Sequence, residues 1–324
     1  MKSIAYTLIA LILLAGVVVA GTVSYGWHLF TAPGPLANET VFVLEKGTGL
    51  RKLAGQLEQN NIINNDLAFI FGVTVEDNSG RLQAGEYDIP AAVTGEALMA
   101  LFVSGKVVMH RLTIPEGLQS REIRALVAAA EGLEGEITQP MPEGAFLPET
   151  YYYHLGDSRD DLVERMAASM TAATTELMQG NNSVPEIRTA EELVTLASII
   201  EKETGLAAER PHVAGVFLNR LRKGMKLQSD PTVTYGITEG KRDLDRPLSR
   251  KDLATATAYN TYQISGLPKG PIANPGLDSL KAVLAPEKTD NLYFVADGSG
   301  GHAFSATLDE HNKNVRKWRK LQKK

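Results

Sequence analysis

The sequence predicts an α+β protein with an N-terminal transmembrane helix, a small unit of strands and helices, and a larger mixed domain. An uncharged apolar run covers Ile4–Val23, and strand-type runs alternate with helix-type spacing from Thr40 to Gly105. Helical patterns dominate from Asp160 onward, until proline-rich and glycine-rich segments begin after Leu227. With 324 residues, the chain is long enough for about two domains that each bury a core.

The apolar run is long enough to cross a bilayer. At about 1.5 Å per residue, Ile4–Val23 matches a hydrocarbon layer of about 30 Å. Lys2 precedes the run and the aromatic residues Tyr25 and Trp27 follow it, so the positive-inside rule leaves the N-terminus in the cytoplasm. The alternative is a cleaved signal peptide, but its apolar region is usually only about 7–15 residues long. We therefore expect a single-pass anchor in the inner (plasma) membrane, with the chain after about Phe30 exported.

The rest of the chain divides by composition. Residues 1–30 form the anchor, and a linker follows at 31–39, where prolines and a glycine interrupt regular structure. Residues 40–105 form the membrane-proximal module, and residues 106–324 form the second domain. The main elements expected in the second domain are helices at Leu162–Met178, Glu191–Thr204 and Ala207–Lys223, strands at Leu292–Ala296 and His302–Ser305, and a helix from Leu308.

Composition excludes several kinds of chemistry. The chain has no cysteine, which rules out disulfides, thiolate nucleophiles and cysteine-ligated metals. Its formal net charge is −5 and no basic stripe follows the anchor, so nucleic acid is not an expected partner. The six histidines lie on separate segments, and the common hydrolase, zinc and P-loop motifs are missing. The sequence therefore predicts no metal and no cofactor.

Carboxylates remain as acid/base groups, and two of them lie on the helix predicted at Thr189–Thr204. Thr189 and Glu192 form a capping-box pattern that fixes the helix start. On a helical wheel, Glu201 and Glu203 both fall at margins of the apolar stripe, where desolvation would raise a carboxyl pKa and suit it to general acid catalysis. The wheel does not choose between them, and salt-bridged or exposed carboxylates are the simpler explanation of the wheel alone.

Two later segments carry the side-chain types that bind sugars. They are Gln228-Ser229-Asp230-Pro231-Thr232 and Tyr259-Asn260-Thr261-Tyr262. Amide and carboxylate groups form hydrogen bonds with sugar hydroxyls, and a tyrosine ring offers a flat apolar face. Turn formation explains each segment as well when it is taken alone.

Several motifs, in order along the chain, resemble those of the endolytic murein (peptidoglycan) transglycosylases. The main ones are Leu196–Thr204 (LASIIEKET), Val216–Leu221 (VFLNRL) and Gly224–Val233 (GMKLQSDPTV). The match extends through Gly144–Tyr151, Tyr259–Tyr262, Gly266–Pro268, Tyr293–Val295 and Gly301–Phe304. It covers nearly all of the chain after the anchor. One departure is Glu149, which stands where an aspartate is commoner and keeps the charge.

This resemblance implies a LysM-like module at residues 40–105 and a catalytic domain at 106–324. It implies that Glu201 is the catalytic acid/base, and that the glycan strand is held by Asn219, Gln228, Asp230, Tyr259, Asn260 and Tyr262. The implied enzyme is a lyase that cleaves between N-acetylmuramic acid and N-acetylglucosamine and leaves 1,6-anhydro ends. Peptidoglycan strands are the implied substrate, and peptidoglycan synthases in the same membrane are the implied partners.

Two other functions fit the sequence. The chain could be a hydrolase in which Asp230 activates water opposite Glu201, or a non-catalytic scaffold that binds the wall. The assignment of Glu201 also carries a structural requirement. The assignment fails if the Glu201 carboxyl is both neutralised by a buried cation and closed off from any cleft.

Overall fold

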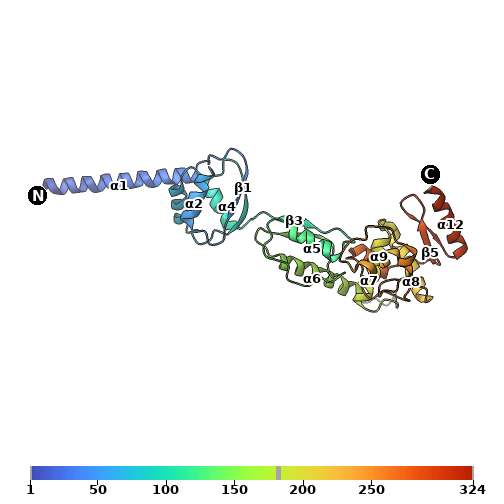
Figure 1. The fold of residues 1–324 in the computed structure, drawn as a ribbon. Coiled ribbons are helices and arrows are strands. Elements are labelled where there is room, and N and C mark those ends of the chain that lie inside the picture. The colour runs from blue at the N-terminus through green and yellow to red at the C-terminus, as the bar shows by residue number, and fades with distance from the viewer. Residues whose placement is uncertain (1, 180–183, 323–324) are drawn as a thin grey trace. The chain divides into compact units, whose positions relative to one another are not determined.

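The computed structural model describes residues 2–179 and 184–322 (Figure 1). Helices and short strands are mixed along the chain, and the described strands form three two-stranded sheets, β1-β2, β3-β4 and β5-β6. The predicted α+β class is therefore confirmed. The chain divides between His110 and Arg111 into two compact units, which we call the N-terminal unit and the C-terminal unit.

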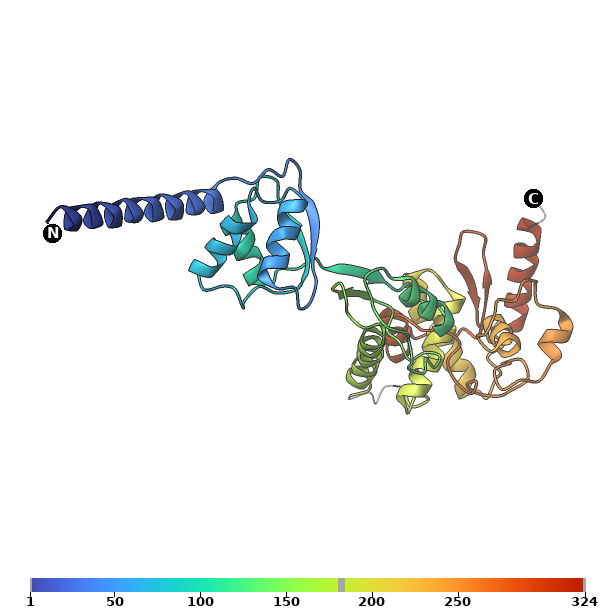
Figure 2. The same ribbon diagram turned by 60° about the vertical axis from the view of Figure 1, so that its left-hand side comes forward.

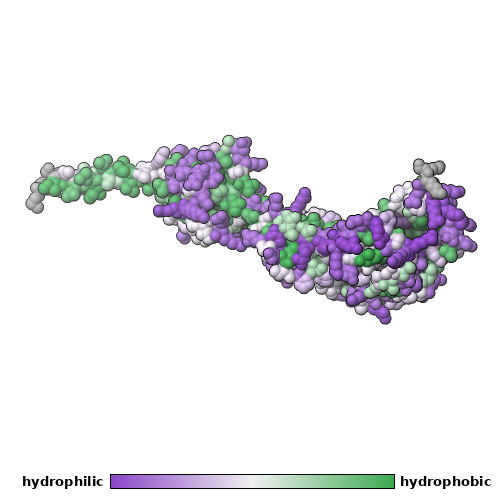
Figure 3. Space-filling model, in the orientation of Figure 1, coloured by the Kyte–Doolittle hydropathy of each residue, from purple (hydrophilic) through white to green (hydrophobic). Residues whose placement is uncertain are grey.

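Helix α1 (Lys2–Thr31) contains the predicted apolar run. Its segment Ile4–Thr31 is long and apolar enough to cross a membrane, and Figure 3 shows hydrophobic residues along it. The last turn of α1 belongs to the core of the N-terminal unit, because Phe30 is only 1% exposed. Its ring lies 6.2 Å from that of Phe69 and directly over Gly72. The helix is thus fixed to the unit by a buried side chain.

The remaining elements of the N-terminal unit alternate two strands with three helices. They are β1 (Thr40–Leu44), α2 (Leu50–Gln59), α3 (Asp66–Val75), β2 (Gly85–Ile89) and α4 (Gly95–Ser104). β1 and β2 pair antiparallel, with Thr40 opposite Ile89 and Leu44 opposite Gly85. Side chains alternate along β1, so that Phe42 and Leu44 are buried while Val41 and Val43 are exposed.

The C-terminal unit contains two apolar cores. Its first elements are β3 (His110–Thr113), α5 (Ser120–Ala129), β4 (Thr150–Tyr153) and α6 (Arg159–Met178), which enclose one core. The second core surrounds α7 (Ala190–Glu203), α8 (Arg210–Arg222) and α11 (Leu277–Leu284). The other elements are the 3-10 helix η1 (Ala207–Glu209), α9 (Asp230–Thr238), α10 (Arg250–Ala254), β5 (Tyr293–Ala296), β6 (His302–Ser305) and α12 (Leu308–Leu321).

The predicted elements differ from the observed ones in two informative places. The helix expected at Ala207–Lys223 is a 3-10 turn followed by α8, which begins only at Arg210. The second difference is helix α9, because Pro231 in the sequence indicates a turn and not the start of a helix. Pro231 lies in the first turn of α9, where a missing N–H breaks no helical hydrogen bond. The C-terminal strands and helix are confirmed, with β5 pairing antiparallel to β6.

The close packing of α1 on α3 predicts that a methyl group added at Gly72 lowers the stability of the N-terminal unit. A Cβ at Gly72 would lie 2.4 Å from the Phe30 ring, so we expect Gly72→Ala to destabilise the N-terminal unit. The expected loss is about 1–3 kcal/mol, typical of overpacking. Urea unfolding of the detergent-solubilised protein measures it through Trp27, in a Trp318→Phe background.

The matched control for this measurement is Gly55→Ala in α2. No heavy atom lies within 4 Å of a Cβ at Gly55, so steric cost is absent there. Alanine is the better helix former, and we expect a gain of up to about 1 kcal/mol. Equal stability of the two variants would show that Phe30 does not pack on α3 as described.

Candidate active site

Helix α7 carries both candidate carboxyls on its last turn. Its start is fixed by the predicted capping box, in which Thr189 Oγ1 accepts from the Glu192 N–H (3.1 Å) and the Glu192 carboxylate accepts from the Thr189 N–H (3.2 Å). Every residue from Leu193 to Ile200 is buried. The chain leaves the helix after Glu203, so the last turn marks the edge of the core.

Glu201 lies in an ion-pair network. Its side chain is only 6% exposed and its carboxylate accepts from Arg210 at 3.0 Å. The other carboxylate oxygen accepts from the Gly276 N–H (3.1 Å) and from Ser279 Oγ (2.7 Å). Arg210 also pairs with Glu116 at 2.8 Å. Glu201 is therefore paired with a buried cation, which is one of the two conditions that together would exclude it as the acid/base.

We expect Arg210→Met to destabilise the C-terminal unit, because it leaves Glu201 buried without its cation. Removal of one partner from a buried pair costs roughly 3–5 kcal/mol. Amide hydrogen exchange in α7 measures the loss. Arg210→Met combined with Glu201→Gln should recover most of it, since no buried charge is then left unpaired and Glu116, the other partner of Arg210, is 40% exposed. Unchanged exchange in the single variant would argue against a structural pair.

Glu203 faces a different environment. It lines a cavity of about 510 Å³, which we call the Glu203 pocket. Ser229 Oγ donates a hydrogen bond to its carboxylate. Burial raises the pKa of Glu203, and the negative charge of Asp230 raises it further, although the Ser229 hydrogen bond opposes both. A carboxyl that is partly buried, holds its proton above the usual range and lines a cavity has the properties of a general acid.

Three of the predicted sugar-binding residues line the same pocket. They are Gln228, Asp230 and Tyr262. The Tyr262 hydroxyl donates to Asp230 Oδ1 at 2.7 Å. Burial, together with this hydrogen bond, raises the pKa of Tyr262, so the hydroxyl stays protonated and remains a donor. Gln228 is exposed, and its backbone adopts a φ of 51°. The pocket thus presents an acid, a carboxylate, a phenol and an amide.

The rest of the lining of the Glu203 pocket comes from residues that were not predicted as site residues. Arg220 donates to the Leu292 carbonyl (2.6 Å) and the Leu227 carbonyl (2.7 Å), and lies 5.3 Å from the centre of the Tyr293 ring. The remaining lining residues are Phe294, Val295, Ala296, His302, Leu308 and His311. The sequence did contain a signal for these lining residues, because the motifs that match the family include Tyr293–Val295 and Gly301–Phe304.

His302 is held in place by Glu209. Its Nδ1 lies 2.8 Å from the Glu209 carboxylate, which also accepts from the His302 backbone N–H at 2.9 Å. Partial burial of Glu209 opposes ionisation, but the hydrogen bonds from His302 hold the pKa of Glu209 below its ordinary value. An ionised Glu209 therefore fixes the orientation of the His302 ring at the edge of the pocket.

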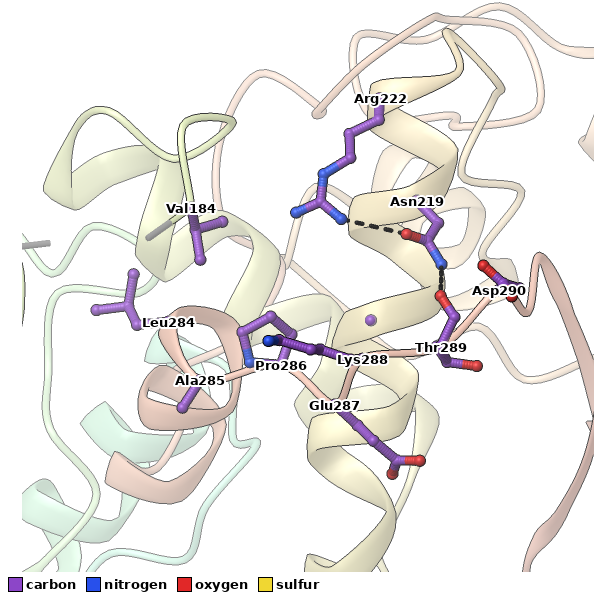
Figure 4. Close-up of a pocket in the computed structure, with 11 residues that line it drawn as sticks. Val184, Asn219, Arg222, Leu284, Ala285, Pro286, Glu287, Lys288, Thr289 and Asp290 are labelled. Atoms are coloured by element: carbon purple, nitrogen blue, oxygen red, sulfur yellow. Dashed lines mark hydrogen bonds between the residues drawn. The ribbon is translucent and has the colours of Figure 1, made fainter. Parts of the chain in front are cut away.

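The other three predicted sugar-binding residues are not in the Glu203 pocket. Asn219 lines a separate cavity of about 740 Å³, shown in Figure 4, and its amide donates to the carbonyls of Thr289 (2.7 Å) and Asn291 (3.1 Å). Asn260 is fully buried and its amide donates to three carbonyls of the preceding segment. Tyr259 stacks edge-on against Tyr235 at 4.8 Å. In this geometry the two asparagine amides support the backbone, and the Tyr259 ring packs against another side chain.

Fold and site together define a class of protein. It is an α+β protein with an apolar N-terminal helix and a polar pocket around one acidic side chain of raised pKa. No group of three or more acidic or histidine side chains in the described ranges could hold a metal ion. The chain belongs to the YceG-like family, whose model matches residues 42–317.

Relatives with known names agree with this membership. The endolytic murein transglycosylase of Bacillus subtilis (strain 168) is 32% identical, over 93% of this chain and 91% of the relative. That of Streptococcus pneumoniae serotype 2 (strain D39 / NCTC 7466) is 28% identical over 96% of this chain, which spans 64% of that longer relative. A solved YceG-like protein from Listeria monocytogenes is 29% identical with a TM-score of 0.53, covering 85% of this chain and 98% of that one.

Proposed function

We propose that this chain is a lytic transglycosylase, a lyase that cleaves the glycan strands of peptidoglycan. The observation that carries the proposal is Glu203, a carboxyl of raised pKa in a pocket that also presents Asp230 and Tyr262. Carboxyl, phenol and amide groups suit a polyhydroxylated substrate. Family membership and the names of the relatives support the same activity.

We propose Glu203 as the acid/base in place of Glu201. The resemblance implies Glu201, and Glu203 lies two residues further along the same motif, Leu196–Thr204. The two carboxyls differ in their surroundings, because Glu201 is paired with Arg210 while Glu203 accepts from the neutral hydroxyl of Ser229 and lines the pocket. Only a carboxyl that can both hold and release a proton next to the substrate serves as acid and then as base.

The reaction consumes no water. Protonated Glu203 gives its proton to the glycosidic oxygen as the bond from that oxygen to C1 of N-acetylmuramic acid breaks. The 6-hydroxyl of the same sugar then attacks C1, and the Glu203 carboxylate takes the hydroxyl proton. The products are an N-acetylglucosamine end with a free hydroxyl and a 1,6-anhydro end. The Asp230 carboxylate stabilises the positive charge that develops at C1, and the Tyr262 hydroxyl keeps Asp230 in position.

The N-terminal unit suggests where the reaction occurs. We propose that α1 crosses the inner membrane once and that the rest of the chain lies on the exported side, near nascent glycan. The two strands and three helices that follow α1 are the module that we propose to be LysM-like. Peptidoglycan synthases in the same membrane are proposed partners, and the proposed role is to end or trim glycan polymerisation.

Digestion of purified glycan strands tests the proposal, with the ends identified by mass spectrometry. We expect wild type to produce 1,6-anhydro ends and Glu203→Gln to lower the rate about 10²–10⁴-fold, the usual contribution of a general acid. Glu201→Gln should keep the same products, because it removes a structural anion. Full activity in Glu203→Gln with loss in Glu201→Gln would return the role to Glu201. Reducing ends would indicate hydrolysis with Asp230 as base, and no cleavage by wild type would indicate a wall-binding scaffold.

The pH profile of the same cleavage should report the pKa of Glu203. The acid acts only when protonated, so kcat/KM should fall as pH rises through this raised pKa. Because the Asp230 charge raises the pKa, Asp230→Asn should move the alkaline limb to lower pH. Ser229→Ala should move the limb to higher pH, since the lost hydrogen bond had lowered the pKa. Limbs that stay in place in both variants would assign the titration to another group.

A further inference from the structure

Helix α3 is apolar on every side but is only half covered by protein. Its sequence, DLAFIFGVTV, has one charged residue, at its first position. Ala68, Phe69, Gly72 and Val73 are buried in the core of the N-terminal unit. On another face, Leu67 is 67% exposed and Val75 is 56% exposed. A helix that is apolar all round usually lies in a core or in a membrane, so the exposed face needs a cover.

The two exposed residues belong to an apolar stripe along α3, with the partly buried Phe71 between them. Leu67, Phe71 and Val75 are spaced by four residues, which places them one above another on a helix. The stripe continues onto α1, because the Phe71 ring would lie 3.5 Å from a Cβ at Gly26. Between the two helices is a groove of about 320 Å³. Its lining is Thr22, Val23, Tyr25, Gly26 and Leu29 from α1 and Asn65, Leu67, Ala68 and Phe71 from α3.

The position of this groove along α1 indicates what covers it. The charge-free run Ile4–Val23 accounts for a hydrocarbon layer of about 30 Å. The α1 residues of the groove, Thr22 to Leu29, then lie at the exported boundary of that layer, where tyrosine and tryptophan are enriched. Figure 2 shows α3 on the side of the N-terminal unit from which α1 emerges. The exposed stripe is thus at the depth where acyl chains begin.

We propose that α3 is a membrane-embedded element and that the groove between α1 and α3 binds a phospholipid acyl chain of the exported leaflet. This inference rests on the proposed membrane span of α1. An interfacial helix buries its apolar face about 5–10 Å into the headgroup region. Burial of Leu67, Phe71 and Val75 in this way would seat the N-terminal unit on the bilayer, because Phe30 already fixes the unit to α1.

The absence of cysteine from the sequence allows a direct test with single spin labels. Full-length Leu67→Cys and Val43→Cys are labelled in nanodiscs of phosphatidylethanolamine and phosphatidylglycerol. Val43 is the matched control, an apolar residue of β1 that is 43% exposed on the same unit. We expect the Leu67 label to collide several-fold more with oxygen, which is lipid-soluble, than with a water-soluble nickel chelate. The Val43 label should show the reverse preference.

A third label separates this proposal from the membrane span on which it rests. Ile12→Cys places a label in the middle of the apolar run. If Ile12 prefers oxygen while Leu67 responds like Val43, the anchor stands and the acyl-chain site is refuted. If Ile12 also prefers the nickel chelate, α1 does not span and both ideas fail, while the glycan-cleavage assay remains independent of either result.

Discussion

The geometry of one helix turn separates the two carboxyls on which the site depends. Residues two positions apart on an α-helix point about 160° away from each other, so Glu201 and Glu203 face different environments. Glu201 turns toward Arg210 at the start of α8 and toward Gly276 and Ser279 near α11. Glu203 is thereby directed to the pocket on the other side. The ion pair and the buried residues Leu193 to Ile200 hold α7 in this rotation, and the rotation sets where Glu203 lies.

The surroundings of Glu203 explain why its pKa is raised. Burial disfavours its charged form, and Asp230 places a negative charge nearby. Arg220 is the cation that could have cancelled this effect, but its guanidinium donates to the carbonyls of Leu227 and Leu292. His302 is likewise held by Glu209. Arg220 and His302 are therefore both held by other partners, and they only moderate the raised pKa of Glu203.

Local sequence signals predicted the fold class and the elements that depend on nearby residues. The α+β class, the capped start of α7 and the C-terminal strands and helix all follow from patterns a few residues long. Local spacing could not assign the roles of Glu201 and Glu203. The donors to Glu201 are 9 to 78 residues away along the chain, so no wheel or motif shows that one carboxyl meets a cation.

Polar side-chain type was an equally incomplete guide to the pocket. Gln228, Asp230 and Tyr262 line it, whereas the amides of Asn219 and Asn260 satisfy backbone carbonyls in irregular segments. An asparagine that binds a sugar and one that stabilises a loop carry the same side chain. They differ only in which carbonyls lie within hydrogen-bonding distance of the amide. Which carbonyls lie nearby depends on the tertiary structure, so the sequence alone does not distinguish the two roles.

The N-terminal helix is a second case in which the sequence does not show a tertiary contact. Hydropathy identifies α1 as a helix that could span a membrane, but hydropathy does not show that Phe30 is buried against Phe69 and Gly72. A flexible linker directly after the helix would let the N-terminal unit move freely relative to α1. A buried aromatic ring instead makes the end of α1 part of the core, because its displacement would open a cavity. The position of the N-terminal unit along the helix is therefore set by packing and not by linker length.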